Sequence, residues 1–299
     1  MNTEAYDIIC IGNYTKDTII TPAGTRHVDG GGSRYAAYAA ARLGLTAAVV
    51  TNLAEEDMYI VDDLERNRIG CIHTFTPRST LMQLFYPTTN PDIRTLTVTG
   101  VAGPITAGEV EGVQTKAAVI GSSLRGEVGL DVIRILDGKN VLLAADMQGF
   151  VRVLHGQELK YEPWPEMEET LAHLDILKSD AVEAEFLTGE TDIFKAAGSF
   201  ASMGPREIVL THKDGVLIYD NGKCHEFSFY PQNLSGRSGR GDTCIGTYVA
   251  MRLSKPPFEA GIWAAAVTSL KMETLGPFNR SRQDVETLIR NRYNHGSLF

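Results

Sequence analysis

The segment 239–242 combines residue types and spacing that suit chemistry, because two glycines stand directly before an aspartate and a helical pattern. Gly239 and Gly241 let the backbone turn tightly, so that several free N–H groups at the helix start point to one place. The helix dipole adds partial positive charge there, which favours a bound phosphate. Arg237 and Arg240 strengthen this expectation, because two cations beside an amide nest suit a multiply charged anion.

Asp242 ends this motif and admits two interpretations. A carboxylate at a helix start serves as a helix cap, or as a general base that takes the proton of a substrate hydroxyl. Taken alone, a Gly-x-Gly-Asp sequence before a helix is more often a capped turn than a catalytic element. The surrounding sequence therefore has to decide between a cap and a base at Asp242.

Short apolar runs rich in Val and Ile alternate along the chain with longer segments of helical pattern. Continuous apolar strands separated by helices predict an α/β fold of three layers, with a mostly parallel sheet between helices. Helices are predicted at 34–43 and 128–136, and a β-hairpin within 215–229. The predicted parallel strands are 7–11, 47–51, 117–120, 141–145, 174–177 and 207–211.

Polar residues follow several of these strands, at the edge where a doubly wound sheet binds its ligands. Asp180 and Glu183 also have the spacing of a capping box, so a purely structural role for them stays open. The residues expected to line one crevice are Gly12, Asn13, Asp17, Asp146, Gln148, Lys178, Asp180, Glu183 and the segment 211–215.

Two stretches depart from the alternation of strand and helix. The segments 15–32 and 72–106 carry Thr, Pro and alternating apolar residues, which is typical of surface β-strands. They predict either a small antiparallel flap attached to the main sheet or two ordinary surface hairpins. Because no repeat or long linker interrupts the chain, we expect 1–299 to form a single domain.

Composition and charge exclude several classes of protein. The chain has 299 residues, with 28 Lys and Arg against 37 Asp and Glu, so its formal charge is −9. This balance argues against coating nucleic acid or an anionic membrane, because both depend on a positive field. The four cysteines are far apart, the first residues show no leader pattern, and no apolar run reaches the length of a membrane span. We therefore expect a cytoplasmic protein.

The order of these features resembles the ribokinase-type, or PfkB, family of carbohydrate kinases, and the likeness spans nearly the whole chain. The segment 12–17 is similar to the family's opening strand, and the glycines 30–32 before an Ala-rich helix resemble its Gly-Gly signature. The segment 180–189 resembles its Asn-x-x-Glu motif, and 239–242 resembles its anion hole and catalytic base. Each fragment alone is weak, but four in the same order form a strong signal.

The resemblance implies phosphorylation of a hydroxyl of a small sugar or cyclic polyol by ATP, under a small β lid that closes over the sugar. Because only residues 18–29 separate Asp17 from the glycine cluster, we expect a reduced lid, in a monomer or homodimer. It implies that Asp242 is the catalytic base. The implied anion hole consists of Gly239, Arg240 and Gly241. The implied substrate-binding residues are Asn13, Asp17, Gly30, Gly31, Gly32, Tyr35, Gln148 and Arg152. The implied nucleotide-binding residues are Lys178, Asp180, Glu183, Thr211, Lys213 and Gly215, of which Asp180 and Glu183 hold Mg²⁺ through water.

Several positions depart from the family's pattern. The family has Ala where Arg240 stands, Asn where Asp180 stands, and a substrate-contacting Asn where Tyr35 stands. Its nucleotide-side Thr-x-Gly-x-x-Gly pattern is shortened to 211–215, and Ile262 stands near the purine pocket in a position that is often Asn. These departures leave the phosphoryl donor and the acceptor more open than the fold.

Two alternatives to a sugar kinase remain open. A nucleoside kinase of the same fold would use Tyr35 to stack on a base. A regulatory protein that binds sugar or nucleotide without chemistry would explain the altered nucleotide-side motif, although retention of Asp242 argues against it. An NAD-dependent dehydrogenase is excluded, because no Gly-x-Gly-x-x-Gly follows the first predicted strand.

Overall fold

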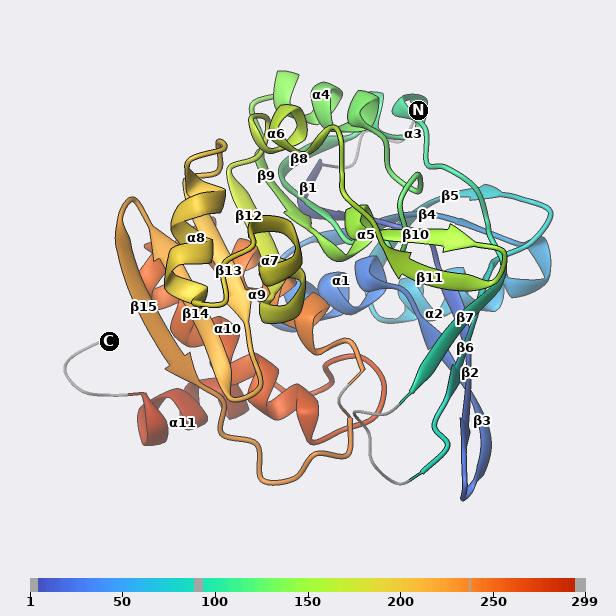
Figure 1. The fold of residues 1–299 in the computed structure, drawn as a ribbon. Coiled ribbons are helices and arrows are strands. Elements are labelled where there is room, and N and C mark those ends of the chain that lie inside the picture. Colours follow the sequence, from blue (N-terminus) through green and yellow to red (C-terminus); the bar gives the residue numbers. More distant parts are fainter. Residues whose placement is uncertain (1–4, 89–93, 237, 294–299) are drawn as a thin grey trace.

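A large sheet forms the middle layer of the molecule (Figure 1). The computed structural model describes residues 5–88, 94–236 and 238–293. The strands of this sheet are β1 (Ala5–Ile11), β4 (Ala47–Leu53), β5 (Ile69–Phe75), β8 (Gln114–Ile120), β9 (Leu142–Asp146), β12 (Ile176–Asp180), β13 (Glu207–Thr211), β14 (Gly215–Asp220) and β15 (Lys223–Ser228). They pair in the order β15-β14-β13-β12-β9-β8-β1-β4-β5. Strands from β13 to β5 run parallel, and β14 and β15 form an antiparallel hairpin at one edge.

Helices cover both faces of this sheet because neighbouring strand residues point to opposite sides. On β1, Ile8 and Cys10 belong to one core, whereas Ile9 and Ile11 belong to the other. The first core is closed by α1 (Gly32–Arg42), α2 (Tyr59–Arg66), α9 (Arg240–Arg252), α10 (Pro257–Met272) and α11 (Arg282–Arg292). The second is closed by α3 (Ala107–Glu111), α4 (Leu130–Gly138), α6 (Met167–Leu171), α7 (Ala181–Thr188) and α8 (Ile193–Ala201). Among the described residues, no helix has the length and apolar character needed to span a membrane.

A smaller sheet adjoins the carboxyl edge of the parallel strands (Figure 1). Its strands are β2 (Thr15–Thr21), β3 (Gly24–Gly30), β6 (Thr80–Phe85), β7 (Thr95–Gly100), β10 (Arg152–His155) and β11 (Glu158–Tyr161). They pair in the order β10-β11-β7-β6-β2-β3, antiparallel except between β2 and β6. Ile19, Met82, Leu84 and Val98 give this sheet an apolar cluster of its own.

The predicted α/β fold with a mostly parallel sheet is confirmed, and a small antiparallel sheet is present beside it. Some boundaries differ. The strand predicted at 174–177 is β12, which runs on to Asp180, so Lys178 and Asp180 are its last residues and do not follow it. Residues 72–75, at the start of the predicted flap segment 72–106, lie in β5 of the large sheet. The hairpin of β10 and β11 was not predicted, because strands of four residues are too short to show a period. The short helices η1 (Glu55–Asp57) and α5 (Gln148–Val151) follow β4 and β9.

Candidate active site

The start of α9 forms a corner that suits an anion. Its N-cap, Gly239, has a left-handed backbone with φ of 76°, and the N–H of Thr243 donates to Gly239 O at 2.9 Å. A side chain at Gly239 would overlap the ring of Tyr35, and a Cβ on Gly241 would lie 2.6 Å from Lys178 Nζ. Both glycines are therefore required, and the N–H groups of the first helical turn lie beside a buried ammonium group.

Asp242 lies in the first turn of α9 and points toward the start of α1. A Cβ on Gly32 would lie 2.6 Å from Asp242 Oδ1, so the carboxylate occupies the space that any side chain there would need. Burial raises the pKa of Asp242 to about 6, and the nearby Asp146 carboxylate adds to this rise. Lys178 and Arg152 act in the opposite direction. This carboxylate is ionised at neutral pH and its pKa is close to that pH, as a general base requires.

Asp17 on β2 supplies a second carboxylate on the α1 side of the site. Its Oδ1 atom is buried and has no hydrogen-bond partner among the described residues. Burial raises the pKa of Asp17 to about 6, against a hydrogen bond from Thr15 that lowers it. The charges of Asp29 and Asp242 add to the rise. Because an unpaired buried oxygen costs free energy, Asp17 is suited to accept a hydrogen bond from a ligand hydroxyl.

Glycine residues border the carboxylate of Asp17. A Cβ on Gly30 would lie 2.7 Å from Asp17 Oδ2. Gly31 has a φ of 103°, and a Cβ there would lie 2.9 Å from Asn13 O. The predicted glycine cluster is therefore needed for the close approach of three chain segments, and Gly32 completes it against the carboxylate of Asp242.

Two residues predicted to bind the acceptor have partners within the chain. The Asn13 side chain is fully buried, where its Nδ2 donates to Gly103 O at 2.7 Å and its Oδ1 accepts from the N–H of Asn52 at 3.1 Å. The Tyr35 ring is 4% exposed and packs against Gly239. In this geometry both side chains hold loops of the site in place, and their contact with a substrate stays a prediction.

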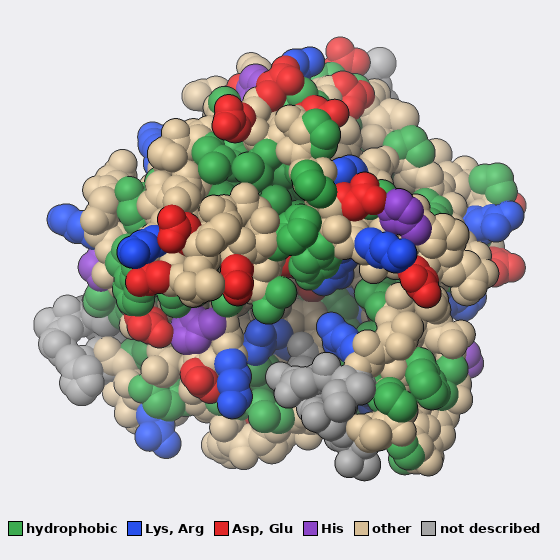
Figure 2. Space-filling view, in the orientation of Figure 1, with side chains coloured by type: hydrophobic (Ala, Val, Ile, Leu, Met, Phe, Trp, Pro, Cys, Tyr) green, Lys and Arg blue, Asp and Glu red, His purple; other side chains and the backbone are tan. Residues whose placement is uncertain are grey.

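A cavity of about 450 Å³ lies beside the start of α9. Lys and Arg side chains border this hollow at the lower centre of Figure 2. Its carboxylates are Asp180 and Asp242, and Gln148 and Thr211 also line it. Such a concentration of positive charge suits a small, multiply charged anion. The cationic lining residues are Arg94, Arg152, Lys178 and Arg240.

Two of these cations are held by buried carboxylates. Lys178 Nζ lies 2.7 Å from Asp146 Oδ2, and both side chains are at most 5% exposed. Burial lowers the pKa of Lys178, but the Asp146 and Glu183 carboxylates outweigh it, so the ammonium stays charged. Arg152 lies 3.6 Å from Glu183, whose pKa burial raises to about 7 although the charge of Lys178 lowers it. Cations held in this way keep their positions before any anion arrives.

Asp180 and Glu183 form the capping box that their spacing indicated. The N–H of Glu183 donates to Asp180 Oδ1 at 2.8 Å, and the N–H of Asp180 donates to Glu183 Oε2 at 3.1 Å. Asp180 also lines the cavity. In the part of the chain that the structure describes, no group of three His, Cys, Asp or Glu side chains could hold a metal ion by itself. The donor set fits a magnesium ion that is bound mainly by phosphate oxygens and water.

A second cavity of about 470 Å³ adjoins the first and shares Asp180, Thr211 and Arg240 with it. Lys213 lines this second cavity, together with the apolar side chain of Phe229. The Arg240 guanidinium lies 5.9 Å from the centre of the Phe229 ring. Gly215, also predicted on the nucleotide side, is the first residue of β14 and is not among the described residues that line either cavity.

The sequence prediction missed several lining residues. Arg94 and Tyr86 come from the segment that was predicted only as a flap, and Arg94 Nη1 donates to the Tyr86 hydroxyl at 3.2 Å. Ser238, which also lines the first cavity, directly precedes the predicted anion segment 239–242. Arg237, predicted to help bind the anion, lies outside the described residues. The alternation of apolar residues predicts the strands of the flap. That pattern does not indicate which polar residues of the flap reach the cavity.

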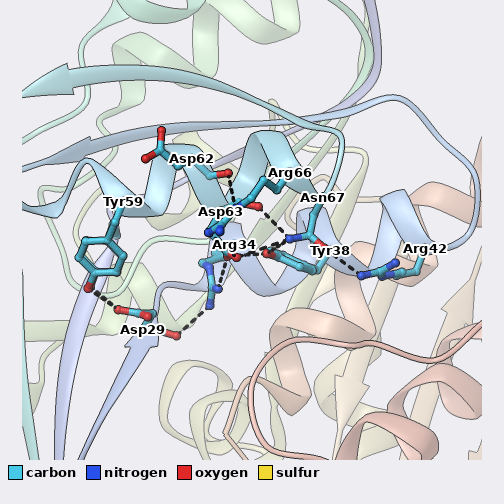
Figure 3. A network of polar contacts seen from close by, with 10 residues as sticks. Asp29, Arg34, Tyr38, Arg42, Tyr59, Asp62, Asp63, Arg66 and Asn67 are labelled. Carbon is cyan, nitrogen blue, oxygen red and sulfur yellow. Dashed lines mark hydrogen bonds and ion pairs between the residues drawn. The ribbon is translucent and has the colours of Figure 1, made fainter.

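A network of polar contacts fixes the base of the smaller sheet against the body (Figure 3). Asp29 Oδ1, at the end of β3, accepts hydrogen bonds from the Tyr14 hydroxyl at 2.6 Å and the Tyr59 hydroxyl at 2.8 Å. Arg34 on α1 donates to Asp29 O at 3.0 Å and to Asp63 Oδ2 at 2.8 Å. The turn from β3 into α1, which carries the glycine cluster, is therefore tied to α2 on both sides.

Comparison with known proteins shows which solved structures this chain resembles. No family model matches the chain. A pyrophosphate-dependent kinase in the ribokinase family, solved as a sulfate complex, is 34% identical, with a TM-score of 0.87 over 93% of this chain and 99% of its own. A structure of a pyrophosphate-dependent kinase in the same family, with a pyrophosphate analog and myo-inositol, is 33% identical, with a TM-score of 0.86 over 93% of this chain and 99% of its own.

More distant relatives share the fold. Ribokinase from Arabidopsis thaliana, complexed with ribose and ATP, is 18% identical and superimposes with a TM-score of 0.77 over 96% of this chain and 99% of its own. A cytidine kinase from Thermococcus kodakarensis is 25% identical over 257 residues, which is 82% of this chain and 87% of its own.

The fold, the buried Asp242 carboxylate and the cationic cavity define a phosphotransferase that acts on a hydroxyl acceptor. A sequence identity of 34% over 93% of the chain shows membership of the same family in addition to a shared fold. The chain belongs to the ribokinase family, as the order of its motifs indicated.

Proposed function

We propose that the protein transfers a phosphoryl group to a hydroxyl of a small cyclic polyol or sugar. The observation that carries this proposal is the place of Asp242. Its buried carboxylate stands at a helix start that suits an anion, and it touches the glycine cluster beside Asp17. A base between an anion site and a hydroxyl-binding carboxylate is the arrangement that phosphorylation of an alcohol needs.

The chain's own residues divide the work of the transfer. Asp17 accepts a hydrogen bond from one acceptor hydroxyl and so orients the ring, while Asp242 takes the proton of the reacting hydroxyl. The acceptor oxygen then forms a bond to phosphorus as the bond between phosphorus and the leaving phosphate oxygen breaks. The N–H groups at the start of α9 and the ammonium of Lys178 stabilise the charge on the transferring oxygens.

For the donor we propose pyrophosphate in place of the ATP that the sequence resemblance implied. Pyrophosphate has no base or ribose, so its binding free energy must come from charge and hydrogen bonds. Four cationic side chains around one cavity of about 450 Å³ supply both. The two similar structures at 33–34% identity are of pyrophosphate-dependent kinases, and the shortened nucleotide motif at 211–215 supports the same donor.

ATP is the second candidate donor, and the second cavity favours it. That cavity of about 470 Å³ is continuous in its lining with the first through Arg240 and Thr211, and Phe229 and Met272 give it apolar wall. An aromatic side chain and aliphatic surface suit a purine ring. With ATP as donor, the first cavity would take the phosphates and the second the nucleoside, close to Lys213.

A magnesium ion fits the donor side with either donor. Asp180 lines both cavities and would hold the ion through water, while phosphate oxygens provide the direct ligands. The bound ion supplies neutralisation of the negative charge on the donor. Glu183 contributes indirectly, because its carboxylate fixes the backbone of Asp180 and pairs with Arg152.

For the acceptor we propose a cyclic polyol such as myo-inositol. The pyrophosphate-dependent kinase at 33% identity was solved with myo-inositol, and Asp17 has a free carboxylate oxygen for a hydroxyl. The nucleoside alternative relied on Tyr35 to stack on a base. The ring of Tyr35 is 4% exposed and packs on Gly239, so it offers little surface to a base.

We also propose that the smaller sheet acts as a lid over the acceptor. Asp17 lies on β2 of this sheet, and Arg94 and Tyr86 bring the same sheet to the donor cavity. A lid that contacts both substrates excludes water, which competes with the acceptor for the phosphoryl group. Because Asp29 anchors the base of the sheet, the closing motion that we propose would lie in the outer parts of β2 and β3.

The test is turnover of the purified protein with each donor and acceptor in parallel. Myo-inositol, ribose, fructose and cytidine are each incubated with magnesium and either pyrophosphate or ATP, and products are followed by ³¹P NMR. We expect a phosphorylated polyol with pyrophosphate, and no product with Asp242→Asn. Binding of a polyol and a donor without any product would instead establish the regulatory alternative. Phosphorylation of cytidine alone would establish the nucleoside kinase.

A further inference from the structure

Lys271 on α10 has no role in the proposed reaction, although its side chain reaches Gly236, three residues before the anion segment. It is 0% exposed, and lysine is rarely buried so completely. Its Nζ donates to Gly236 O at 2.7 Å and lies 3.5 Å from Thr274 O. The ammonium therefore bridges the segment that leads into Gly239 and the turn that follows α10.

The backbone on both sides of this ammonium is in close contact. The N–H of Gly236 donates to Met272 O at 2.8 Å. A side chain at Gly236 would overlap Thr274 O, so only glycine allows the two segments to approach this closely. Two carbonyl oxygens turned toward one point repel each other unless a positive charge lies between them, and Lys271 supplies that charge.

The ring of Tyr35 connects Lys271 to the anion corner. Lys271 Nζ lies 5.4 Å from the centre of this ring, which is within the range of a cation–π interaction. The same ring fills the space above Gly239, the N-cap of α9. Lys271 therefore contacts two groups next to the start of α9: the carbonyl oxygen of Gly236 and the ring of Tyr35, which packs on Gly239.

The charge on the Lys271 ammonium depends on two opposing effects. Burial lowers the pKa of Lys271 to about 8, and the Asp242 carboxylate opposes that fall. A buried ammonium costs free energy, so an apolar side chain at this place would be expected unless the charge had a use. The use that the geometry offers is to hold the segment before α9.

We propose that Lys271 is a positioning residue of the phosphoryl transfer: its ammonium is an internal cation that holds Gly236 and the ring of Tyr35, which packs on Gly239, so that the N–H groups of α9 face the donor. The proposal rests on the proposed function.

The variant Lys271→Met keeps the length of the side chain and removes the charge. We expect it to bind magnesium pyrophosphate at least tenfold more weakly by titration calorimetry and to lose kcat, with the KM for the acceptor unchanged. Ammonium or methylammonium chloride restores donor binding and kcat, and tetramethylammonium chloride at equal ionic strength does not. Such rescue depends on the size of the cation, and a merely structural loss of packing would not respond to it.

The matched control is Lys255→Met. Lys255 also places its ammonium 5.9 Å from an aromatic ring, that of Trp263, but it precedes the other end of α10, about 24 Å away along the helix. We expect this variant to bind pyrophosphate as the wild type does and to gain nothing from ammonium ions.

The outcomes separate this inference from the proposed function. A wild-type protein that binds neither pyrophosphate nor ATP overturns the proposed function. A wild-type protein that binds the donor while Lys271→Met binds it equally well overturns the inference, as does a folded variant that small cations fail to rescue. Should Lys271→Met not fold, Lys271→Arg decides, because it keeps the positive charge: pyrophosphate binding and kcat close to those of the wild type support the inference, and a tenfold loss of pyrophosphate binding in the folded Lys271→Arg protein overturns it.

Discussion

Replacing Asp242 by Asn tests the chemistry most directly, because Asn has the same size and cannot accept the proton. With a pKa of about 6, roughly nine-tenths of the wild-type carboxylate is ionised at neutral pH and ready to act. A positioned general base contributes about 10²–10⁴-fold to a rate. We therefore expect kcat to fall by about that factor, with little change in the KM for the acceptor that Asp17 orients.

The same substitution has an opposite effect on stability. The pKa of Asp242 rises from 3.8 in the unfolded chain to about 6 in the fold, so the ionised form disfavours the folded state. The free energy of unfolding therefore decreases as the pH rises from about 4 to about 6, and at one pKa unit per 1.36 kcal/mol the loss is of order 1–3 kcal/mol. Asn carries no charge, so we expect Asp242→Asn to be more stable than the wild type at neutral pH.

The assay combines steady-state rates with urea unfolding of each variant at about pH 5 and pH 8. The control is Asp220→Asn. Asp220 is the last residue of β14 and pairs with Glu207, the first residue of β13, so it lies at the end of the strands away from the site. We expect the control to keep wild-type rates. A variant Asp242→Asn that is slow and also less stable would mean that Asp242 holds the fold together, and full activity would refute its role as base.

Three further predictions follow from the same contacts. The kcat/KM of the wild type should fall below about pH 6 with a slope steeper than one, because the pKa values of Asp17 and Asp242 both lie near that pH; a flat profile down to about pH 4.5 contradicts this. Gly32→Ala should lower kcat at least 10²-fold, because its Cβ would lie 2.6 Å from Asp242 Oδ1, whereas Gly138→Ala at the end of α4 has open space and should be neutral in the same assay. Lys213→Met should raise the KM for ATP and leave that for pyrophosphate unchanged, since Lys213 lines only the second cavity; equal effects on both donors would refute the division between the two cavities.

The fold could be predicted from the sequence because its signals are local. Apolar runs such as 117–120 are buried on both faces of a parallel sheet, so they appear as continuous apolar residues without alternation. The turn of Gly239 and Gly241 and the helix start at Asp242 could be predicted for the same reason, since a tight turn before a helix is encoded within four residues. The capping box of Asp180 is equally local.

The rest of the site depends on contacts between distant segments. Asn13 carries the right residue type for a substrate ligand, and only the positions of Gly103 and Asn52 show that its side chain is already bonded. Lys271 stands 29 residues after Asp242 in an Ala-rich apolar helix, where a lone lysine resembles a surface residue. No period or motif places its ammonium beside Gly236, because that contact depends on how α9 and α10 pack.

The positions of the carboxylates and cations in the site also limit the charge that an acceptor can carry. In the proposed site Asp17 and Asp242 both face the acceptor, and burial raises the pKa of each, with a further rise from neighbouring carboxylates. An anionic acceptor such as a sugar phosphate would bring a third negative charge to these two carboxylates, against strong repulsion at low dielectric. A neutral polyol brings only hydroxyl dipoles. Four Lys and Arg side chains line the cavity proposed for the donor, and this local positive charge would let a chain of formal charge −9 bind a polyphosphate there.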